Sequence, residues 1–414
     1  MWRVDIMVLR LSLIAYLSLF LLGVSGCQEG ATLLGAIVCQ GIGRPVGPNP
    51  ANPLGFRGLD ARIPPRIRPG SYASPTPGVR FLDGESIGPH SYWYSWSERN
   101  GIVYTCKAGH IDIAHVRKAA DWTGFLAAIT LECLHNNETE FSFKLREPSL
   151  YFVKLTYPAE WEGLAKKEQE RIARDVSVKL GQYFAYTAAT WHEILTWFGY
   201  QPKAVQSEFQ SAFSWEDVFS NLLGTHIAVL ALEDTEHDFS QAVTLALDRQ
   251  LKELGAQPGQ TARRAAEKVW GLWFSRPLFF TVMQRRNFDV GLNDGFVTPW
   301  LVPSLAECEG AQAQSLPVPE LDFLGQYGFS MKLEIEPREW EKDKVLRIVF
   351  GFGAPKRTLS RLGNPFPLDG VPPDVKKRGK RLEPAVDFPR IMDHIQADAI
   401  RRYGPDVGLQ AGGS

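Results

Sequence analysis

The feature that most constrains the fold of this chain is a long helical stretch, which we expect to span residues 162–198. Gly199 follows directly, and glycine is typical of the position just after a helix. The small side chains of Ala185 and Ala188 allow another element to pack closely against the helix just before His192. A fold built around such a helix is dominated by helices.

Segments with other periodicities accompany this helix. Further helices are expected at residues 111–134, from residue 214, at 240–254, at 261–274 and before Gly404, and strands at 101–106, 141–145 and 150–156. Residues 331–336 alternate apolar with charged side chains, and residues 345–350 are apolar except for Arg347, so the two segments predict the strands of a β-hairpin. The expected fold class is α+β: one large helix-dominated domain with short strands and a C-terminal β-hairpin.

The first 26 residues are typical of a lipoprotein signal peptide. Residues 11–24 carry no charge, but they are fewer than the roughly 20 residues that span a bilayer as a helix. They lead into L-G-V-S-G-C at 22–27, which resembles a lipobox, so Cys27 is the expected lipidation site. Gln28 follows instead of Asp, which in the enteric sorting pattern implies the outer membrane. We expect a lipid-anchored, periplasm-facing protein of the cell envelope; a plain secretory signal or an uncleaved anchor are the alternatives.

Residues 41–78 are dense in Pro and Gly and show neither helical nor strand periodicity. Such a segment is typical of an extended spacer between a membrane and a domain, and the alternative is an arm that lies over the domain surface. The expected organisation is a signal peptide at 1–26, the lipidated Cys and tether at 27–78, a globular α+β domain at 79–404 and a flexible tail at 405–414.

Four cysteines remain after Cys27, namely Cys39, Cys106, Cys133 and Cys308. Three pairings are open to them in a compartment that permits disulfides. We favour a bond between Cys106 and Cys133, which flank one expected helix, and buried free thiols are the alternative. No C-x-x-C occurs, which argues against a structural zinc site of thiolates.

The segment T-W-H-E-I-L-T-W-F-G-Y at 190–200 lies on the long helix and resembles half of a zinc motif. In peptidases with H-E-x-x-H, two His bind the metal from one helix face and the Glu activates a water molecule. His192 and Glu193 match the first half, so His192 is a candidate metal ligand and Glu193 a candidate catalytic base. Thr196 stands where the second His would be. The alternative is a core His192 satisfied by a buried carboxylate, with Glu193 as its partner.

The next helix carries D-V-F-S-N-L-L-G-T at 217–225, which is similar to the third-ligand helix of the gluzincin metallopeptidases, E-x-x-S-D-x-x-G. This resemblance makes Asp217 a candidate metal ligand. It also implies that Ser220 and Asn221 contact the metal ligands rather than the metal itself. The alternative is a capping box in which the Asp217 carboxylate bonds back to the amide of Ser214.

Ionisable residues are also concentrated at 108–122. Asp112 and His115 lie at i and i+3, so they share a helix face. We expect His115 to lie near His192 and to replace the ligand missing at Thr196, with Asp112 orienting an imidazole. The alternative is an Asp112 favoured by the helix dipole and simply paired with His115.

Several motifs together resemble a family of uncharacterised bacterial lipoproteins, classed only as a domain of unknown function. They are the lipobox, G-H-I-D-I-A-H-V-R-K-A-A-D-W at 109–122, T-W-H-E-I-L-T-W-F-G-Y at 190–200, F-S-W-E-D-V-F-S-N-L-L-G at 213–224 and L-G-A-Q-P at 254–258. The resemblance covers most of residues 80–350 and implies no activity, cofactor or substrate.

Two functions from different classes remain in view. One is a membrane-tethered metal-dependent hydrolase with a variant zincin-like site, for which zinc is the expected metal. The other is a non-catalytic envelope lipoprotein that binds or organises an envelope component. Nucleic acid is not an expected partner, because 45 basic and 46 acidic residues leave a net charge of −1 without a basic stripe. The substrate or protein partner is not specified by the residues.

Overall fold

The computed structural model describes residues 55–66, 68, 80–93, 96–145, 147–200, 208–275, 282–351 and 380–410. The expected signal peptide, the lipidation site Cys27 and most of the tether lie outside these residues. None of the helices in the described part combines the length and the apolar character needed to span a bilayer.

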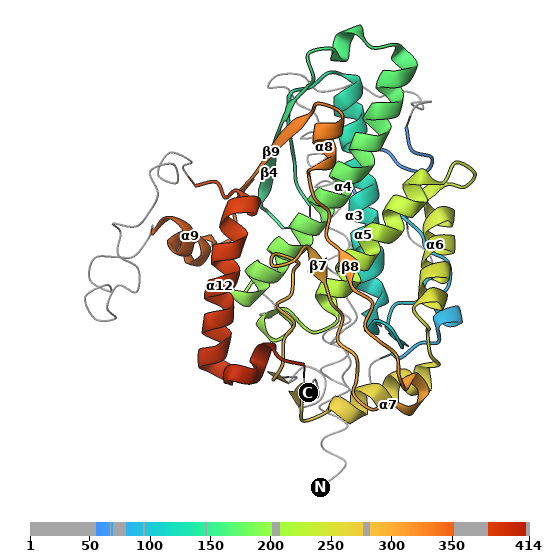
Figure 1. The fold of residues 1–414 in the computed structure, drawn as a ribbon, viewed down its shortest axis with the longest axis vertical. Coiled ribbons are helices and arrows are strands. Elements are labelled where there is room, and N and C mark those ends of the chain that lie inside the picture. The colour runs from blue at the N-terminus through green and yellow to red at the C-terminus, as the bar shows by residue number, and fades with distance from the viewer. Residues whose placement is uncertain are drawn as a thin grey trace, which may run out of the picture.

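Three helices, α3 (Ile113–His135), α4 (Lys166–Trp197) and α5 (Asp217–Glu233), pack side by side at the centre of the domain (Figure 1). Of the 23 residues of α3, 19 are buried, so this helix is covered on almost every side. The helices α6 (Phe239–Glu253) and α7 (Gly259–Val269) follow in sequence, and α6 packs on α5. The expected helix-dominated core is confirmed, although α7 ends five residues before the predicted end.

Glycine allows the central helices to approach one another closely. A Cβ atom on Gly224 of α5 would lie 2.2 Å from the carbonyl oxygen of Val116 in α3. A Cβ atom on Gly181 of α4 would lie 2.7 Å from the backbone nitrogen of Ala127, also in α3. Both distances are far below van der Waals contact, so each crossing requires a residue without a side chain. The Gly224 contact sets the position of the N-terminal half of α5 against the start of α3.

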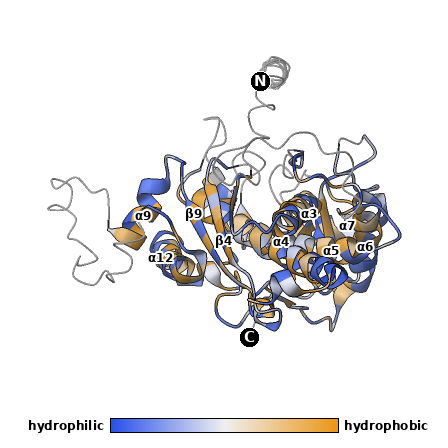
Figure 2. Cartoon of the chain, turned by 90° about the horizontal axis from the view of Figure 1, so that it is seen from above, coloured by the Kyte–Doolittle hydropathy of each residue, from blue (hydrophilic) through white to orange (hydrophobic). Residues whose placement is uncertain are grey.

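A three-stranded antiparallel sheet has the strand order β3 (Glu140–Phe143), β4 (Leu150–Thr156) and β9 (Ser330–Glu336). Alternate residues of β4 are buried, among them Tyr151 and Val153, as expected for a strand with one face on a core. The sheet stands between the central helices and the C-terminal helices α9 (Lys342–Phe350) and α12 (Pro384–Tyr403) (Figure 2).

The predicted C-terminal β-hairpin is wrong. Residues 345–350 belong to helix α9, and β9 pairs with β4 instead. Val345 and Val349 lie one helical turn apart and are both buried. The helix ends at Gly351, which adopts a left-handed conformation with φ of 70°. A run of six residues with five apolar side chains fits either a strand or a buried helix face, and here tertiary packing selects the helix. The α+β class itself is confirmed.

Smaller elements complete the described fold. They are β1 (Ile102–Thr105), β2 (Gly109–Asp112), β5 (Phe274–Ser275), β6 (Val282–Met283), β7 (Phe296–Val297), β8 (Leu316–Pro317), α8 (Phe323–Gln326), and the short 3-10 turns Gly84–Ser86, Trp161–Gly163, Glu208–Gln210, Ala306–Cys308 and Pro405–Gly408. The pairs β1–β2, β5–β6 and β7–β8 each form a two-stranded antiparallel sheet.

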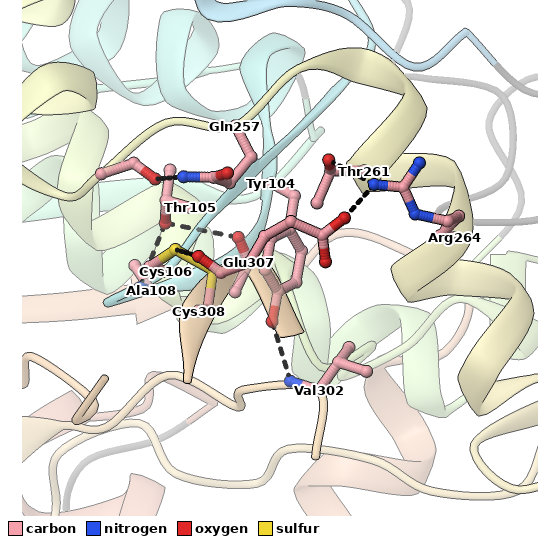
Figure 3. The surroundings of a disulfide bond; sticks show 12 residues. Tyr104, Thr105, Cys106, Ala108, Gln257, Thr261, Arg264, Val302, Glu307 and Cys308 are labelled. Atoms are coloured by element: carbon pink, nitrogen blue, oxygen red, sulfur yellow. Dashed lines mark hydrogen bonds and ion pairs between the residues drawn. A yellow bond between two sulfur atoms is a disulfide. The ribbon is translucent and has the colours of Figure 1, made fainter. Parts of the chain in front are cut away.

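A disulfide between Cys106 and Cys308 links the end of β1 to a loop 202 residues later in the sequence (Figure 3). The favoured pairing of Cys106 with Cys133 is therefore wrong, and Cys133 takes part in a different disulfide. The bond lies at the edge of a second, smaller core built around Tyr104, Trp215 and Trp273. Closing so long a loop reduces the conformational freedom of the unfolded chain.

Part of the predicted tether packs on the domain. Phe56 is buried in the main core, and Arg68 is buried in ion pairs with Glu98 and with Asp121 of α3. These residues follow the alternative in which the segment is an arm on the domain surface. Near the other end, Val407 in the expected tail is also buried.

Candidate metal centre

The junction of β2 and α3 places Asp112 against His115. Asp112 is the N-cap residue of α3, and its Oδ1 accepts hydrogen bonds from the backbone N–H groups of Ala114 (2.8 Å) and His115 (3.4 Å). Its other oxygen, Oδ2, lies 2.8 Å from Nδ1 of His115. One carboxylate oxygen therefore caps the helix, and the other faces the imidazole.

Helix α5 adds a second carboxylate to this pair. Oδ1 of Asp217 lies 3.3 Å from Nδ1 of His115. One turn further along α5, Oγ of Ser220 accepts a hydrogen bond of 2.9 Å from the backbone N–H of Asp112. The close approach at Gly224 continues the same contact between α5 and α3. Two elements about a hundred residues apart in sequence thus meet at one point.

Asp112, His115 and Asp217 each offer one ligand atom, and all three atoms lie within 4.8 Å of one another. Zinc binds such atoms at about 2.0–2.2 Å, so two ligand atoms on one tetrahedral ion are about 3.4 Å apart. The 3.3 Å separation of His115 Nδ1 and Asp217 Oδ1 matches that spacing, whereas the 2.8 Å separation of His115 Nδ1 and Asp112 Oδ2 would widen around an ion. Side-chain exposure is 1% for Asp112 and 5% for Asp217 but 16% for His115, so solvent reaches the group on the imidazole side. The residues therefore fit a single divalent metal ion.

The group carries more negative than positive charge. Burial raises the pKa of Asp217 to about 6, and the carboxylates of Glu193 and Asp112 add to this effect against the opposing influence of His115. Burial also opposes protonation of His115, but Asp217 and Asp112 outweigh it and raise the pKa of the imidazole. A divalent cation would neutralise the carboxylates that repel one another here.

An Asp and a His at this spacing are not in themselves evidence for a metal. Asp234 and His237 have the same local geometry, because Asp234 Oδ1 accepts from the His237 backbone N–H at 2.9 Å and Oδ2 lies 2.9 Å from His237 Nδ1. That pair is partly exposed, and no metal-binding group of three in the described residues includes it. The third carboxylate, Asp217, distinguishes the buried pair.

Glu193 of α4 lies close enough to Asp217 to raise its pKa. Its Oε2 accepts a hydrogen bond of 2.8 Å from the backbone N–H of Phe213. Phe213 has a left-handed backbone with φ of 54°, which is unusual for a bulky residue and directs this N–H at the carboxylate. The candidate base is thus held beside the three-residue group.

His192 forms an ion pair with Glu147, whereas the sequence suggested Glu193 as its partner. Its Nδ1 lies 2.6 Å from Oε1 of Glu147, which is fully buried in the loop before β4. Burial opposes ionisation of Glu147, yet His192 lowers the pKa of this carboxyl. Lys118 acts electrostatically on both Glu147 and His115, so the two charged groups lie near the same lysine. The structure brings His115 and Asp217 together with Asp112 and pairs His192 with Glu147.

The remaining features that the sequence singled out are the capping box at Ser214, Asn221 and Thr196. The capping box is not formed: α5 begins at Asp217, and the N–H of Ser214 donates to the carbonyl of Ser211 at 3.0 Å. Asn221 is buried on α5, and within the described part of the chain its Oδ1 accepts no hydrogen bond. The same holds for the buried Oγ1 of Thr196.

Glu147 is the residue that the sequence did not indicate. It lies in an irregular segment between β3 and β4, so no helical or strand periodicity relates it to His192. The alternative interpretation of His192, an imidazole satisfied by a buried carboxylate, describes its contact, although the carboxylate is not Glu193.

Comparison with known proteins gives one match. A family model described as a protein of unknown function, DUF4056, matches residues 80–295, which is 216 of the 414 residues. No curated protein and no solved structure shows significant similarity. The matched region includes β1 to β6 and all three residues of the candidate metal centre. The chain therefore belongs to the DUF4056 family of proteins of unknown function.

Proposed function

We propose that this protein binds one divalent metal ion through Asp112, His115 and Asp217 and is a metal-dependent hydrolase. The observation that carries the proposal is that three possible ligand atoms lie within 4.8 Å of one another. They come from two elements that are distant in sequence, and two of the three side chains are carboxylates. Asp112 Oδ2 is the oxygen available to the ion, since Oδ1 holds the start of α3. Zinc is the first candidate, but a donor set with only one imidazole also suits manganese.

A metal ion at this position would supply a Lewis acid that polarises the scissile group of the substrate. Glu193 accepts the proton of the attacking water, since its carboxylate is held beside Asp217 by the N–H of Phe213. Lys118, which acts electrostatically on His115, supplies positive charge for the leaving group. Ser220 positions Asp112 through its backbone.

Calorimetric titration of metal-stripped protein with zinc, and separately with manganese, tests the binding step. We expect saturation at one ion per chain, and loss of binding in His115→Ala and Asp217→Asn. His237→Ala is a matched control, because it removes the imidazole of the other Asp-x-x-His pair. Equal affinity in wild-type protein and His115→Ala would refute the assignment.

A non-catalytic lipoprotein that binds or organises an envelope component is the second candidate. The observation in its favour is that Asp112 and Asp217 both face Nδ1 of His115, so a protonated imidazole satisfies them without a metal. Absence of zinc and manganese binding in the titration would leave this function as the better account.

We also propose that the chain is anchored in the envelope, in the outer membrane, by lipid on Cys27. The support is the apolar run that leads into the lipobox-like segment at 22–27. Cys27→Ser should leave an unprocessed precursor without lipid. A variant processed to normal size with unchanged membrane fractionation would contradict this anchoring.

A further inference from the structure

A cavity of about 430 Å³ lies apart from the candidate metal centre. It is lined by the N-terminal arm, the last turns of α3, the first half of α4 and the connection from α5 to α6. Its volume falls within the range of small-molecule sites, roughly 300–1,000 Å³. None of the three residues of the metal centre lines it.

The lining of this cavity combines charged and apolar side chains. Four basic residues line it, against two acidic ones, which gives a net charge of +2; they are Arg57, Lys167, Arg171, Arg174, Glu170 and Asp234. Phe56, Leu131, Leu232 and Phe239 provide the apolar part. The cavity therefore suits a ligand with an anionic end and a small apolar end.

Backbone carbonyl groups hold two of the arginines, Arg57 and Arg174, in place. The guanidinium of Arg57 donates to the backbone carbonyls of Thr235 and Glu236. Arg174 donates to the carbonyl of Leu232 at 3.1 Å and stacks on the ring of Phe56, 4.4 Å from its centroid. In the described part of the chain, no carboxylate forms an ion pair with either guanidinium.

Arg171, which lies on α4 like Arg174, differs from these two arginines because it forms ion pairs. It is paired with Glu168 and with Asp175, so its charge is already compensated. Burial lowers the pKa of Arg174, and Arg57 adds to this effect while Asp175 opposes it. Two guanidinium groups that repel one another, each fixed by backbone carbonyls, leave donors for an anion.

We propose that this cavity binds a phosphate monoester with a small apolar substituent. A monoester carries a charge of about −1.5 to −2 at pH 7, which the two uncompensated guanidinium groups of Arg57 and Arg174 would balance. Guanidinium N–H groups bind phosphate oxygens, and Arg57 and Arg174 each have donors beyond those that bind the backbone carbonyls. The apolar substituent would lie against Phe56 and Phe239.

Phenyl phosphate is a suitable probe, titrated into the full-length protein in the presence of a chelator so that the metal centre plays no part. We expect saturable binding that weakens as salt is added. Phenol, which keeps the ring but lacks the charge, should not bind. No saturation up to about 10 mM phenyl phosphate, equivalent to less than about 3 kcal/mol of binding, would overturn the proposal.

Substitutions of the two arginines test whether phenyl phosphate binds in this cavity. Arg174→Gln and Arg57→Gln should each weaken phenyl phosphate binding at least about tenfold. Arg57 lies at the surface, so its variant tests the site even if Arg174→Gln is poorly folded. Arg263→Gln is a matched control, because Arg263 also lies over an aromatic ring, that of Phe81, but does not line the cavity. Equal affinity in all three variants would overturn the assignment.

The phosphate monoester could belong to a soluble metabolite or to a lipid head group, and competition separates the two. Vesicles of phosphatidic acid in phosphatidylcholine that displace phenyl phosphate would support the site with a lipid as its source. Displacement by soluble glycerol phosphate, with no effect of the vesicles, would support it with a soluble ligand. Binding of benzoate in preference to phenyl phosphate would overturn the choice of phosphate.

Discussion

Two Asp-x-x-His segments of this chain have the same local geometry in different surroundings. In both, the Asp uses Oδ1 to accept from the backbone N–H of the His and places Oδ2 within 2.8–2.9 Å of its Nδ1. At the start of α3, Asp112 is buried and His115 is half-buried. Asp234 and His237 lie in the turn between α5 and α6, where the side chain of His237 is 38% exposed.

The difference between the two segments arises from tertiary packing. Hydrogen bonds from His237 and Glu236 lower the pKa of Asp234 to about 2, so its carboxylate is fully satisfied within the turn. At the buried segment α5 brings in Asp217, whose pKa burial and neighbouring carboxylates raise to about 6. Local sequence is sufficient for the Asp–His pair, whereas a metal site also requires a third ligand from another helix.

The largest expected effect comes from separating α5 from α3. A Cβ atom in Gly224→Ala would lie 2.2 Å from the carbonyl oxygen of Val116, which belongs to the backbone and cannot move alone. We expect the variant to lose about 3 kcal/mol of unfolding free energy, measured with urea, and to bind zinc more weakly because Asp217 is displaced.

Gly325→Ala is the control for this variant, because Gly325 is also helical but a Cβ atom there would meet nothing within 4 Å. It should be neutral or slightly stabilising, as alanine favours helix more than glycine does. A Gly224→Ala variant as stable as the control would show that the contact between α3 and α5 does not determine the site.

A more gradual effect is expected from a third Asp–His contact, that of the buried residues Asp121 and His90 at 3.0 Å. Burial lowers the pKa of His90, and Arg68 and Arg117 add to this effect, although Asp121 opposes it. The unfolded chain, with an imidazole pKa of 6.5, then binds the proton more readily. Stability is therefore complete above about pH 6.5 and falls as the pH decreases below that value.

Urea unfolding at intervals between pH 7.5 and pH 5 measures this dependence, and because Asp217 also titrates near pH 6, the comparison with a His90 variant isolates the part that His90 causes. His90→Gln removes the titrating group, so its stability should depend less on pH than that of the wild type. His237→Gln serves as the exposed control. The same pH dependence in wild type and His90→Gln would mean that other groups cause the loss of stability.

The smallest expected effect is that of Asp217→Asn on the metal-free protein. This change removes a carboxylate that Asp112 and Glu193 repel but retains a polar group beside His115, so the unfolding free energy in chelator should change by no more than about 1 kcal/mol. With zinc at about 100 times its Kd, only the wild type should gain about 2.7 kcal/mol. A loss of about 3 kcal/mol in chelator would instead indicate a structural role for Asp217.

Much of the fold could be predicted because it depends on local periodicity. The helices α3, α4 and α6 begin and end within about four residues of the predicted positions, α5 begins three residues after its predicted start, and β4 has the predicted bounds. The failures involve contacts distant in sequence. The partner of β9 is β4, about 180 residues earlier, and that of Cys106 is Cys308, so neither could be found from neighbouring residues.

The candidate site shows the same limit. His115, Asp217 and Asp112 could be selected because buried ionisable groups require partners. Their grouping depends on the Gly224 contact, which the glycine in the motif at 217–225 indicates only in retrospect. The pairing of His192 with Glu147 depends on a loop without periodicity, and the sequence alone does not reveal it.

Diffraction from crystals soaked in zinc, collected on both sides of the zinc absorption edge, tests the central claim most directly. We expect one anomalous peak at about 2.0–2.2 Å from Oδ2 of Asp112, from His115 and from Asp217. No peak is expected at Asp234 and His237, which share the local geometry but lack the third carboxylate. An empty centre, or a peak of equal height at both segments, would contradict the account.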